Sequence, residues 1–250
     1  MTGIDPADAQ LLAALEREGP INLPRAIEVM ERYGLDGLVL GQPVNVFHAT
    51  GHWPQIARTR TDQPPGTFAL IARERPGEWG LVISRFLYYY TWADGRSRSD
   101  VQPWLYGEAG DAGDLSPGQA FPICADAGAV ALSPVEAHRR ATLDDADRNR
   151  TTARDTGAAL VSAMKGVGLW RGRIGFDHPV IAGVMARHDH PGEAVAADNP
   201  IRDIRMIKSP LEQALMARAA QANADALLAV AQAVRAGARH CDLQALFRME

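Results

Sequence analysis

Residues 204–212 read Ile-Arg-Met-Ile-Lys-Ser-Pro-Leu-Glu, and this stretch decides how the chain is divided. A serine can cap a helix, a proline suits its first position, and a glutamate three residues after the serine can bond back to the cap. Ser209, Pro210 and Glu212 supply this pattern, which is a capping box. We therefore predict that a helix begins at Ser209 and that its alanine-rich sequence runs to about Gly237.

Before residue 206, helical and extended patterns alternate along the chain. Helical periodicity with capping residues predicts helices at 5–18, at 22–33, from 144 or 145 to about 168, and at 178–188. Apolar runs predict strands at 35–40, 68–72, 79–83, 101–105, 172–177 and 194–198, and the turn Arg75–Glu78 joins the second and third of them into a hairpin. This alternation predicts one α/β domain over residues 1–206, a mixed β-sheet flanked by helices on both faces.

Three segments are harder to assign from the sequence. Glycine and proline within 43–54 are expected to break any long element. Residues 85–95 (RFLYYYTWADG) combine helical spacing with strand-forming tyrosines, and we favour the helix. Residues 201–209 are interpreted as a connection that crosses to the helix beginning at Ser209.

The composition and charge of the chain exclude several classes of protein. Its 250 residues are 46% hydrophobic and carry a formal net charge of -4, so it lacks the basic face that nucleic-acid binding needs. The small basic groups Arg58–Arg60 and Arg96–Arg98 are interpreted as solvated loop charges. No signal peptide and no membrane span is predicted, and the two cysteines, Cys124 and Cys241, are expected to be free thiols. These features predict a cytoplasmic protein with neither nucleic-acid nor membrane partners.

Four motifs, in the right order along the chain, resemble the creatinase, prolidase and aminopeptidase P family. The stretch 204–212 is similar to the junction that ends the family's amino-terminal domain and opens its catalytic domain. Residues 218–243 resemble the first catalytic-domain helix and its exit. Upstream, GRIGFD (172–177) and the segment Val46–Gly51 are similar to two conserved stretches of the amino-terminal domain, although His48 stands near a family tyrosine.

The resemblance implies two structural parts and one class of reaction. Residues 1–206 would form the amino-terminal domain, with a ribonuclease H-like α/β fold. Residues 207–250 would start a pita-bread α+β catalytic domain that is incomplete here. The family includes metallopeptidases that hydrolyse Xaa-Pro bonds with a pair of divalent metal ions (Mn, Co or Zn) held by aspartates, a histidine and glutamates. The chain stops 42 residues after Lys208, so we expect it to bind no metal, to carry no catalytic residue and to be inactive alone.

The resemblance also implies a role for the amino-terminal domain in dimerisation and substrate gating. The expected partners are a second copy of the chain and a small peptide or small-molecule substrate. In dimers of the family, aromatic residues can reach the neighbouring subunit's active site, and Trp92, Trp53 and His52 are the candidates here. Their alternative role is ordinary packing in the core or at a dimer contact. Two alternative functions stay open, a creatinase-like C–N hydrolase and a non-catalytic peptidase-like module that binds proteins.

Other candidate residues favour structural roles. His188-Asp189-His190 could bind a metal ion, but a solvated loop is the favoured interpretation because no third well-spaced ligand accompanies the pair of histidines. Asp177 follows a strand as a ribose-binding acid would, yet no glycine-rich phosphate loop precedes it, so a dinucleotide site is rejected. The run Tyr88–Tyr90 could stack on bases, but packing is favoured in the absence of a basic track.

The helix that begins at Ser209 has an apolar face that needs a partner. This face is formed by Leu211, Leu215, Ala219, Leu227, Leu228 and Val234. Without a sheet to cover it, the face stays exposed or finds another partner. We therefore expect the chain to self-associate or to fray after about Lys208.

Overall fold

The computed structural model describes residues 5–54, 64–92, 98, 100–107, 131–150 and 152–249. The chain divides into two compact units. The larger unit, Ala13–Ile207, contains the β-sheet and most of the helices. The smaller unit joins Met1–Leu12 to Lys208–Glu250.

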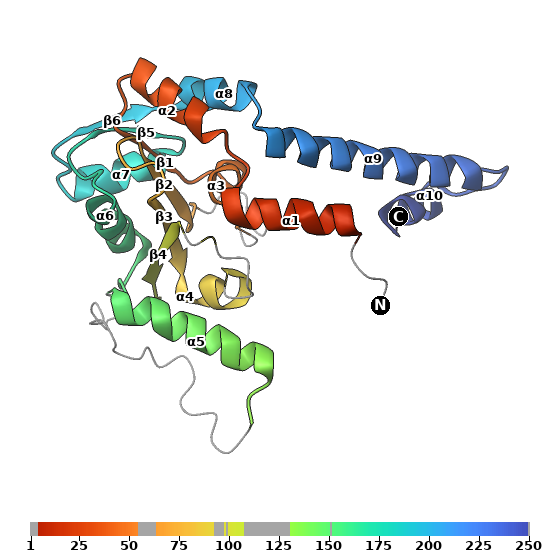
Figure 1. The fold of residues 1–250 in the computed structure, drawn as a ribbon, viewed down its shortest axis with the longest axis horizontal. Helices are drawn as coiled ribbons and strands as arrows, with labels where there is room; N and C mark the ends of the chain where they lie inside the picture. Colours follow the sequence, from red (N-terminus) through yellow and green to blue (C-terminus); the bar gives the residue numbers. More distant parts are fainter. Residues whose placement is uncertain are drawn as a thin grey trace. The chain divides into compact units, whose positions relative to one another are not determined.

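The larger unit is built on one six-stranded mixed sheet (Figure 1). Its strands are β1 (Gly37–Leu40), β2 (Phe68–Ala72), β3 (Trp79–Ser84), β4 (Val101–Tyr106), β5 (Arg173–Phe176) and β6 (Glu193–Ala196). Their order across the sheet is β4-β3-β2-β1-β5-β6. The pairs β1–β2 and β2–β3 are antiparallel, whereas β3–β4, β1–β5 and β5–β6 are parallel. The predicted hairpin and the predicted mixed sheet are both confirmed.

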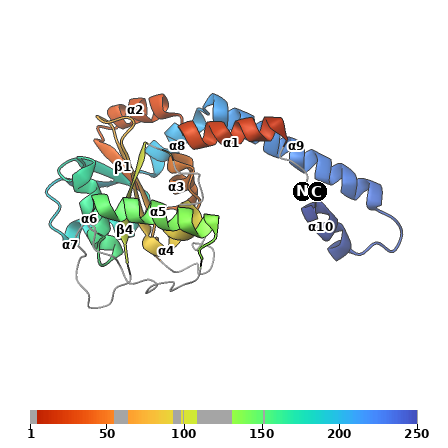
Figure 2. The ribbon, with the colours of Figure 1, turned by 60° about the horizontal axis from the view of Figure 1, so that its bottom comes forward.

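Helices cover both faces of this sheet, as the alternation of patterns predicts. Helices α2 (Leu23–Arg32), α3 (Pro43–Thr50), α5 (Pro134–Asn149) and α8 (Asp198–Met206) contribute buried residues to one core, and α6 (Thr156–Gly166) and α7 (Pro179–Arg187) to the other. Successive strand residues face opposite layers: Leu38 and Leu40 of β1 lie in the first core and Val39 in the second. Figure 2 shows the sheet between these layers.

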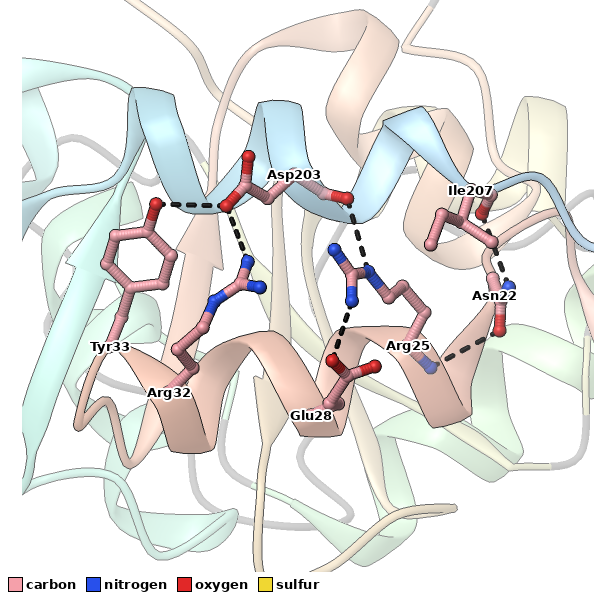
Figure 3. Close-up of polar contacts among 7 residues, drawn as sticks. All are labelled: Asn22, Arg25, Glu28, Arg32, Tyr33, Asp203 and Ile207. Atoms are coloured by element: carbon pink, nitrogen blue, oxygen red, sulfur yellow. Dashed lines mark hydrogen bonds and ion pairs between the residues drawn. The ribbon is translucent and has the colours of Figure 1, made fainter.

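A polar network holds α8 against α2 (Figure 3). The side chains of Arg32 and Tyr33 donate to the carboxylate of Asp203 at 2.5 and 2.9 Å. That hydrogen bond raises the pKa of Tyr33. Asn22 caps α2, accepting from the amide of Arg25, and its own amide donates to the carbonyl of Ile207 at 3.2 Å. These contacts, with Ile201 and Ile204 buried beneath, set which side of α8 faces away from α2.

Two segments differ in detail from the expected elements, each for a local reason. Residues 43–54 contain no long element, as expected, but they do form the eight-residue helix α3, because Pro43 occupies the first helical position and Gly51 ends the helix with φ 77°. The single helix predicted from 144 or 145 to about 168 is two helices, α5 and α6. Between them the chain extends so that Ala153 bridges to Tyr106, and Asp155 caps the second helix.

Residues 85–92 are helical, as favoured from the sequence. They form the short turn α4 (Arg85–Leu87) followed by the π-helical turn η2 (Tyr88–Trp92). The side chain of Tyr88 is buried, whereas Tyr90 is half exposed and stacks on Phe86 with ring centroids 4.8 Å apart. Burial and the nearby Asp145 and Asp147 raise the pKa of Tyr88 to about 12. The run of tyrosines therefore divides between the core and the surface.

Two arginines are buried with a carboxylate partner. Arg98, interpreted from the sequence as a solvated loop charge, is only 4% exposed. It binds Asp100, donates to the carbonyl of Ala49 at 3.0 Å and lies 4.8 Å above the ring of Trp79. Arg85 pairs with Asp147, which also accepts from the hydroxyl of Thr152 at 2.7 Å. Arg58–Arg60, Arg96 and Cys124 lie outside the described residues.

The smaller unit is formed by helices: the start of α1 (Pro6–Glu18), α9 (Pro210–Ala233) and α10 (His240–Met249). The predicted capping box is confirmed: the side chain of Ser209 accepts from the amide of Glu212, and the carboxylate of Glu212 accepts from the amide of Ser209. Arg218 of α9 binds the carboxylate of Asp8 through two hydrogen bonds of 2.6 and 2.9 Å. The exposed Cys241 is a free thiol, as expected. Among the described residues, no helix is long and apolar enough to cross a membrane.

Candidate functional site

A pocket of about 400 Å³ lies where β1 and β5 end. One wall is formed by residues that directly follow these two strands, Gln42, Asn45 and Asp177. The other wall is one side of α8, with Asp198, Ile201, Arg202 and Arg205. All of these side chains belong to the larger unit, and all but one are polar. The pocket is therefore a hydrophilic cavity of the size that holds small ligands.

The topology of the sheet explains why a cavity forms at this point. Strands β1 and β5 are adjacent and parallel, with Gly37 opposite Ile174. The helix after β1 is α3, which packs in one core, and the helix after β5 is α7, which packs in the other. Where neighbouring parallel strands send their connections to opposite faces, a crevice opens beyond their carboxyl ends. The position of the pocket follows from the order of the strands.

Asp177 lines the pocket and holds the start of α3. Its carboxylate accepts hydrogen bonds from the amides of Gly41 and Gln42 at 2.6 and 3.0 Å. The side chain of Gln42 makes no capping bond of its own, so Asp177 supplies the anion at this helix end. The third hydrogen bond to Asp177, at 2.9 Å, comes from the side-chain amide of Asn45. The acid rejected as a ribose ligand is thus a structural anchor that lines a different pocket.

Asn45 connects Asp177 to α8. The residue is 8% exposed, and its side-chain oxygen accepts from Nη1 of Arg205 at 3.3 Å. The chain of contacts Asp177–Asn45–Arg205 therefore links the end of β5, α3 and α8 along the lining of the pocket. The side-chain nitrogen of Asn45 is bound to Asp177 and its side-chain oxygen to Arg205. The side chain of Arg205 is therefore tied to a fixed partner.

The pocket side of α8 carries a regular pattern of charges. Positions 198, 201, 202 and 205 are spaced by three and four residues, so they share one face of the helix. Ile201 is buried and anchors this face to the core, while Asp198 and Arg202 are exposed. Arg202 donates to the side chain of Asn199 at 3.3 Å, and neither Arg202 nor Asp198 makes an ion pair within the part of the chain that the structure describes.

The three residues predicted to gate a neighbouring active site have different environments. His52 is 7% exposed, and burial lowers its pKa to about 4. Trp53 is partly exposed and packs edge to face on Phe47, with ring centroids 6.0 Å apart. Trp92 is the last residue of η2, and its side chain lies outside the described part. The role of all three in gating stays a prediction.

The loop that carries His52 and Trp53 is held from the end of α3. The backbone amide of His52 donates to the hydroxyl of Thr50 at 3.1 Å, and that hydroxyl donates to the carbonyl of Val46 at 2.8 Å. Gly51, between them, has φ 77°, which a side chain rarely tolerates. The side chain of His52 is therefore packed in the interior, whereas that of Trp53 is partly exposed and accessible to a ligand or partner.

Residues 188–190 form a structured turn at the end of α7. Asp189 has φ 52°, and the ring of His190 packs edge to face on Trp170 at 5.1 Å. The ring of His190 is thus a packing element instead of a solvated loop group. Within the described residues, no three histidine, cysteine or acidic side chains come together as a metal site. The side chains described here therefore do not match the metal pair implied by the resemblance, and no chemistry is assigned to one.

Sequence reasoning missed the residues of this pocket except for Asp177. The connection expected at residues 201–209 is wrong, because residues up to Met206 belong to the helix α8, which carries the charged face. The signal was present in the spacing of Asp198, Ile201, Arg202 and Arg205, which follows a helical period. Asn45 lies in the segment expected to be broken, and nothing in its sequence context marks it as the link between Asp177 and Arg205.

Comparison with known proteins finds similarity in structure and none in sequence. No protein-family profile and no curated protein matches the chain. The structure is similar to that of a prolidase from Pyrococcus horikoshii OT3, with 16% identity and a TM-score of 0.50 over 91% of this chain and 48% of that one. It is also similar to that of a dipeptidase from the same organism, with 14% identity and a TM-score of 0.52 over 91% of this chain and 49% of that one.

The chain spans about half the length of these two structures. At this level of identity the similarity concerns the fold. The mixed α/β architecture expected from the resemblance is confirmed by the six-stranded sheet and its two helical layers. The chain therefore has the fold of part of a prolidase or dipeptidase structure.

Proposed function

We propose that the chain is the amino-terminal part of a peptidase-like hydrolase of the creatinase, prolidase and aminopeptidase P family. The most direct support is the junction at Ile207. A compact sheet unit ends there, and a helix with a complete capping box at Ser209–Glu212 begins two residues later. The family junction has this order, and the fold similarity to a prolidase and a dipeptidase agrees with it. The proposed reaction of the whole protein is hydrolysis of an Xaa-Pro bond.

Within such a protein, the proposed role of the sheet unit is dimerisation and substrate gating. Trp53 is partly exposed on a loop whose backbone is fixed by Thr50 and by the left-handed Gly51. A rigid, partly exposed aromatic side chain can close over a ligand on a neighbouring subunit at little cost in conformational entropy. His52, which is buried directly before it, is a positioning residue in this proposal. Trp92 is the second aromatic candidate.

The activity is tested on the full translated product of the coding sequence that contains this chain. We expect it to release proline from Gly-Pro when Mn²⁺, Co²⁺ or Zn²⁺ is added, and we expect the 250-residue chain alone to have no activity. Hydrolysis of creatine in place of Gly-Pro would favour the creatinase-like alternative. Turnover by the 250-residue chain itself would contradict the assignment of the catalytic residues to a later segment.

The gating role requires a separate measurement. Trp53→Ala and Trp92→Ala are expected to lower kcat/KM of the full product about tenfold or more, because an aromatic wall of the site is lost. Trp170→Phe is the matched control, since Trp170 packs on His190 at the other core. Sedimentation velocity on each variant shows whether the dimer persists. An unchanged kcat/KM in both alanine variants would remove the gating proposal and leave the family assignment intact.

A further inference from the structure

We propose that the pocket between α8 and the ends of β1 and β5 binds a small zwitterion of about dipeptide size. Such a ligand has one ammonium and one carboxylate group. The argument rests on the pocket's charges and on its place in the sheet, so it does not depend on the proposed peptidase function.

The charged side chains of the pocket differ in how many hydrogen bonds they make with other residues of the protein. Asp177 accepts three hydrogen bonds, from two backbone amides and from Asn45. Arg205 is bound to Asn45. These two charges line the pocket and are engaged within the protein. They shape the site and fix α8 relative to the strands.

The remaining two charges, Asp198 and Arg202, are positioned for a ligand. They are spaced by four residues on α8, and oppositely charged side chains at this spacing commonly pair with each other. Here neither of them makes an ion pair with any residue that the structure describes. Arg202 is bound only to the neutral side chain of Asn199 among its described contacts. An unused guanidinium and an unused carboxylate therefore line the same 400 Å³ pocket.

The separation of these charges suits the two ends of a short peptide. Side chains four residues apart on a helix have Cβ atoms about 5–6 Å apart. An extended dipeptide spans at most about 7 Å, so its ammonium could reach Asp198 while its carboxylate meets the planar fork of Arg202. A carboxylate is one of the anions that a guanidinium binds in a bidentate manner. The ligand is thus selected by two charges of opposite sign instead of by one.

The site is preorganised by contacts that α8 makes with two other segments. Arg32 of α2 and Tyr33, which follows it, bind Asp203 on another side of α8, as Figure 3 shows. Asn45 binds Arg205 near the end of the same helix. Because α8 is held from these sides, the ligand does not need to order the helix on binding, which would weaken the affinity.

The proposal is tested by NMR titration of the ¹⁵N-labelled 250-residue chain. Glycylglycine is expected to shift the signals of residues 198–205 and of Gly41, Gln42 and Asn45, with a dissociation constant on the order of millimolar. Glycinamide, which lacks the carboxylate, and N-acetylglycine, which lacks the ammonium, are expected to bind about tenfold more weakly or not at all. Glycine distinguishes a free amino acid from a dipeptide as the better ligand.

Two variants and one control locate the binding. Arg202→Gln and Asp198→Asn each remove one charge and keep a polar side chain, and each is expected to weaken glycylglycine binding about tenfold or more. Arg187→Gln is the control, because Arg187 is an exposed arginine at the end of α7 that does not line the pocket. Circular dichroism establishes that each variant is folded.

Three results would overturn the proposal. The first is the absence of shifts in the pocket residues at tens of millimolar glycylglycine. The second is equal binding of glycylglycine by the wild-type chain and by a folded Arg202→Gln variant. The third is equally tight binding of N-acetylglycine, which would make the pocket a simple anion site. The peptidase assay of the full product is unaffected by any of these outcomes.

Discussion

The helices of the sheet unit and the long helix after it are similar in their sequence signals and differ in burial. In α6, five of the eleven residues are buried, including Leu160 and Met164. In α9, three of the twenty-four residues are buried, and Leu227, Leu228 and Val234 are about 60% exposed. Yet α9 has the more complete amino-terminal cap. A capping box thus defines where a helix begins, whereas tertiary packing decides how much the helix contributes to stability.

Ion pairs show the same contrast between the two units. The side chains of Arg85 and Asp147 in the sheet unit are 5% and 9% exposed, and those of Arg239 and Asp242 beside α10 are 75% and 56% exposed. A buried pair that loses one partner leaves an uncompensated charge away from water. When an exposed pair loses one partner, water solvates the remaining charge, so the free energy of unfolding changes little. One chemical change should thus have very different effects in the two regions.

The largest expected effect is therefore that of Asp147→Ala. We expect it to lower the free energy of unfolding by about 4 kcal/mol, because the buried side chain of Arg85 loses its ion pair with Asp147. Urea unfolding monitored by circular dichroism measures the change. Asp242→Ala is the matched control and should leave the midpoint unchanged within error. Similar losses of unfolding free energy in the two variants would show that burial does not decide how much an ion pair contributes to stability.

Removal of the same apolar side chain in each region gives the next largest difference. Leu160→Ala in α6 is expected to cost about 3 kcal/mol, because Leu160 is fully buried and the substitution leaves a cavity. Leu228→Ala in α9 is expected to change the free energy of unfolding by less than about 0.5 kcal/mol. Both are measured by urea unfolding at equal protein concentration. A large loss for Leu228→Ala would mean that its side chain is covered in solution, for example by a second copy of the chain.

Local signals predicted the elements whose ends are marked by their own residues. The cap Ser209 is predictable from the sequence because it depends on a side chain and a backbone amide that are only three residues apart. The hairpin of β2 and β3 was predicted because Arg75–Glu78 supplies the turn between two apolar runs. The long helix after Ser209 was predicted for the same reason, independent of what it packs against.

Long-range contacts decided the features that sequence reasoning missed. Arg98 is buried because Ala49, Asp100 and Trp79 surround it, and two of these are distant in the sequence. The start of α3 is held by Asp177, more than a hundred residues away. The pocket depends on both kinds of contact, because α8 has a readable period but its partners Asn45 and Asp177 come from other elements. Pair contacts of this kind leave no periodic signal in one sequence.

A pH experiment tests a third difference between the regions. Burial lowers the pKa of His52 in the folded chain to about 4, against 6.5 in the unfolded chain, so the unfolded state takes up the proton first as the pH falls. The free energy of unfolding therefore keeps its full value with respect to His52 above pH 6.5 and falls progressively as the pH is lowered toward 4. Between pH 7.5 and pH 5 we expect a loss of about 2 kcal/mol from this group.

The measurement is urea unfolding at both pH values for three proteins. The difference between pH 7.5 and pH 5 should shrink in His52→Gln and should persist in His240→Gln, whose side chain is exposed at the start of α10. Exposed acidic groups also respond to pH, but they contribute equally to all three. An equal pH dependence in the wild type and in His52→Gln would contradict the burial of a neutral histidine.

The smallest expected effect on the sheet comes from cutting the chain in the other region. Trypsin should cleave first after Arg235 and Arg239, which are exposed between α9 and α10, and more slowly after Arg25 and Arg32 of α2. Light scattering identifies whether the sample is a monomer, and mass spectrometry locates the cuts. Because α10 adds no fully buried residue among those described, the sheet should keep its free energy of unfolding within about 0.5 kcal/mol after the cut. A monomer that resists cleavage between 208 and 250 would show that the exposed apolar side chains of α9 are packed after all, and the contrast between the two regions would then fail.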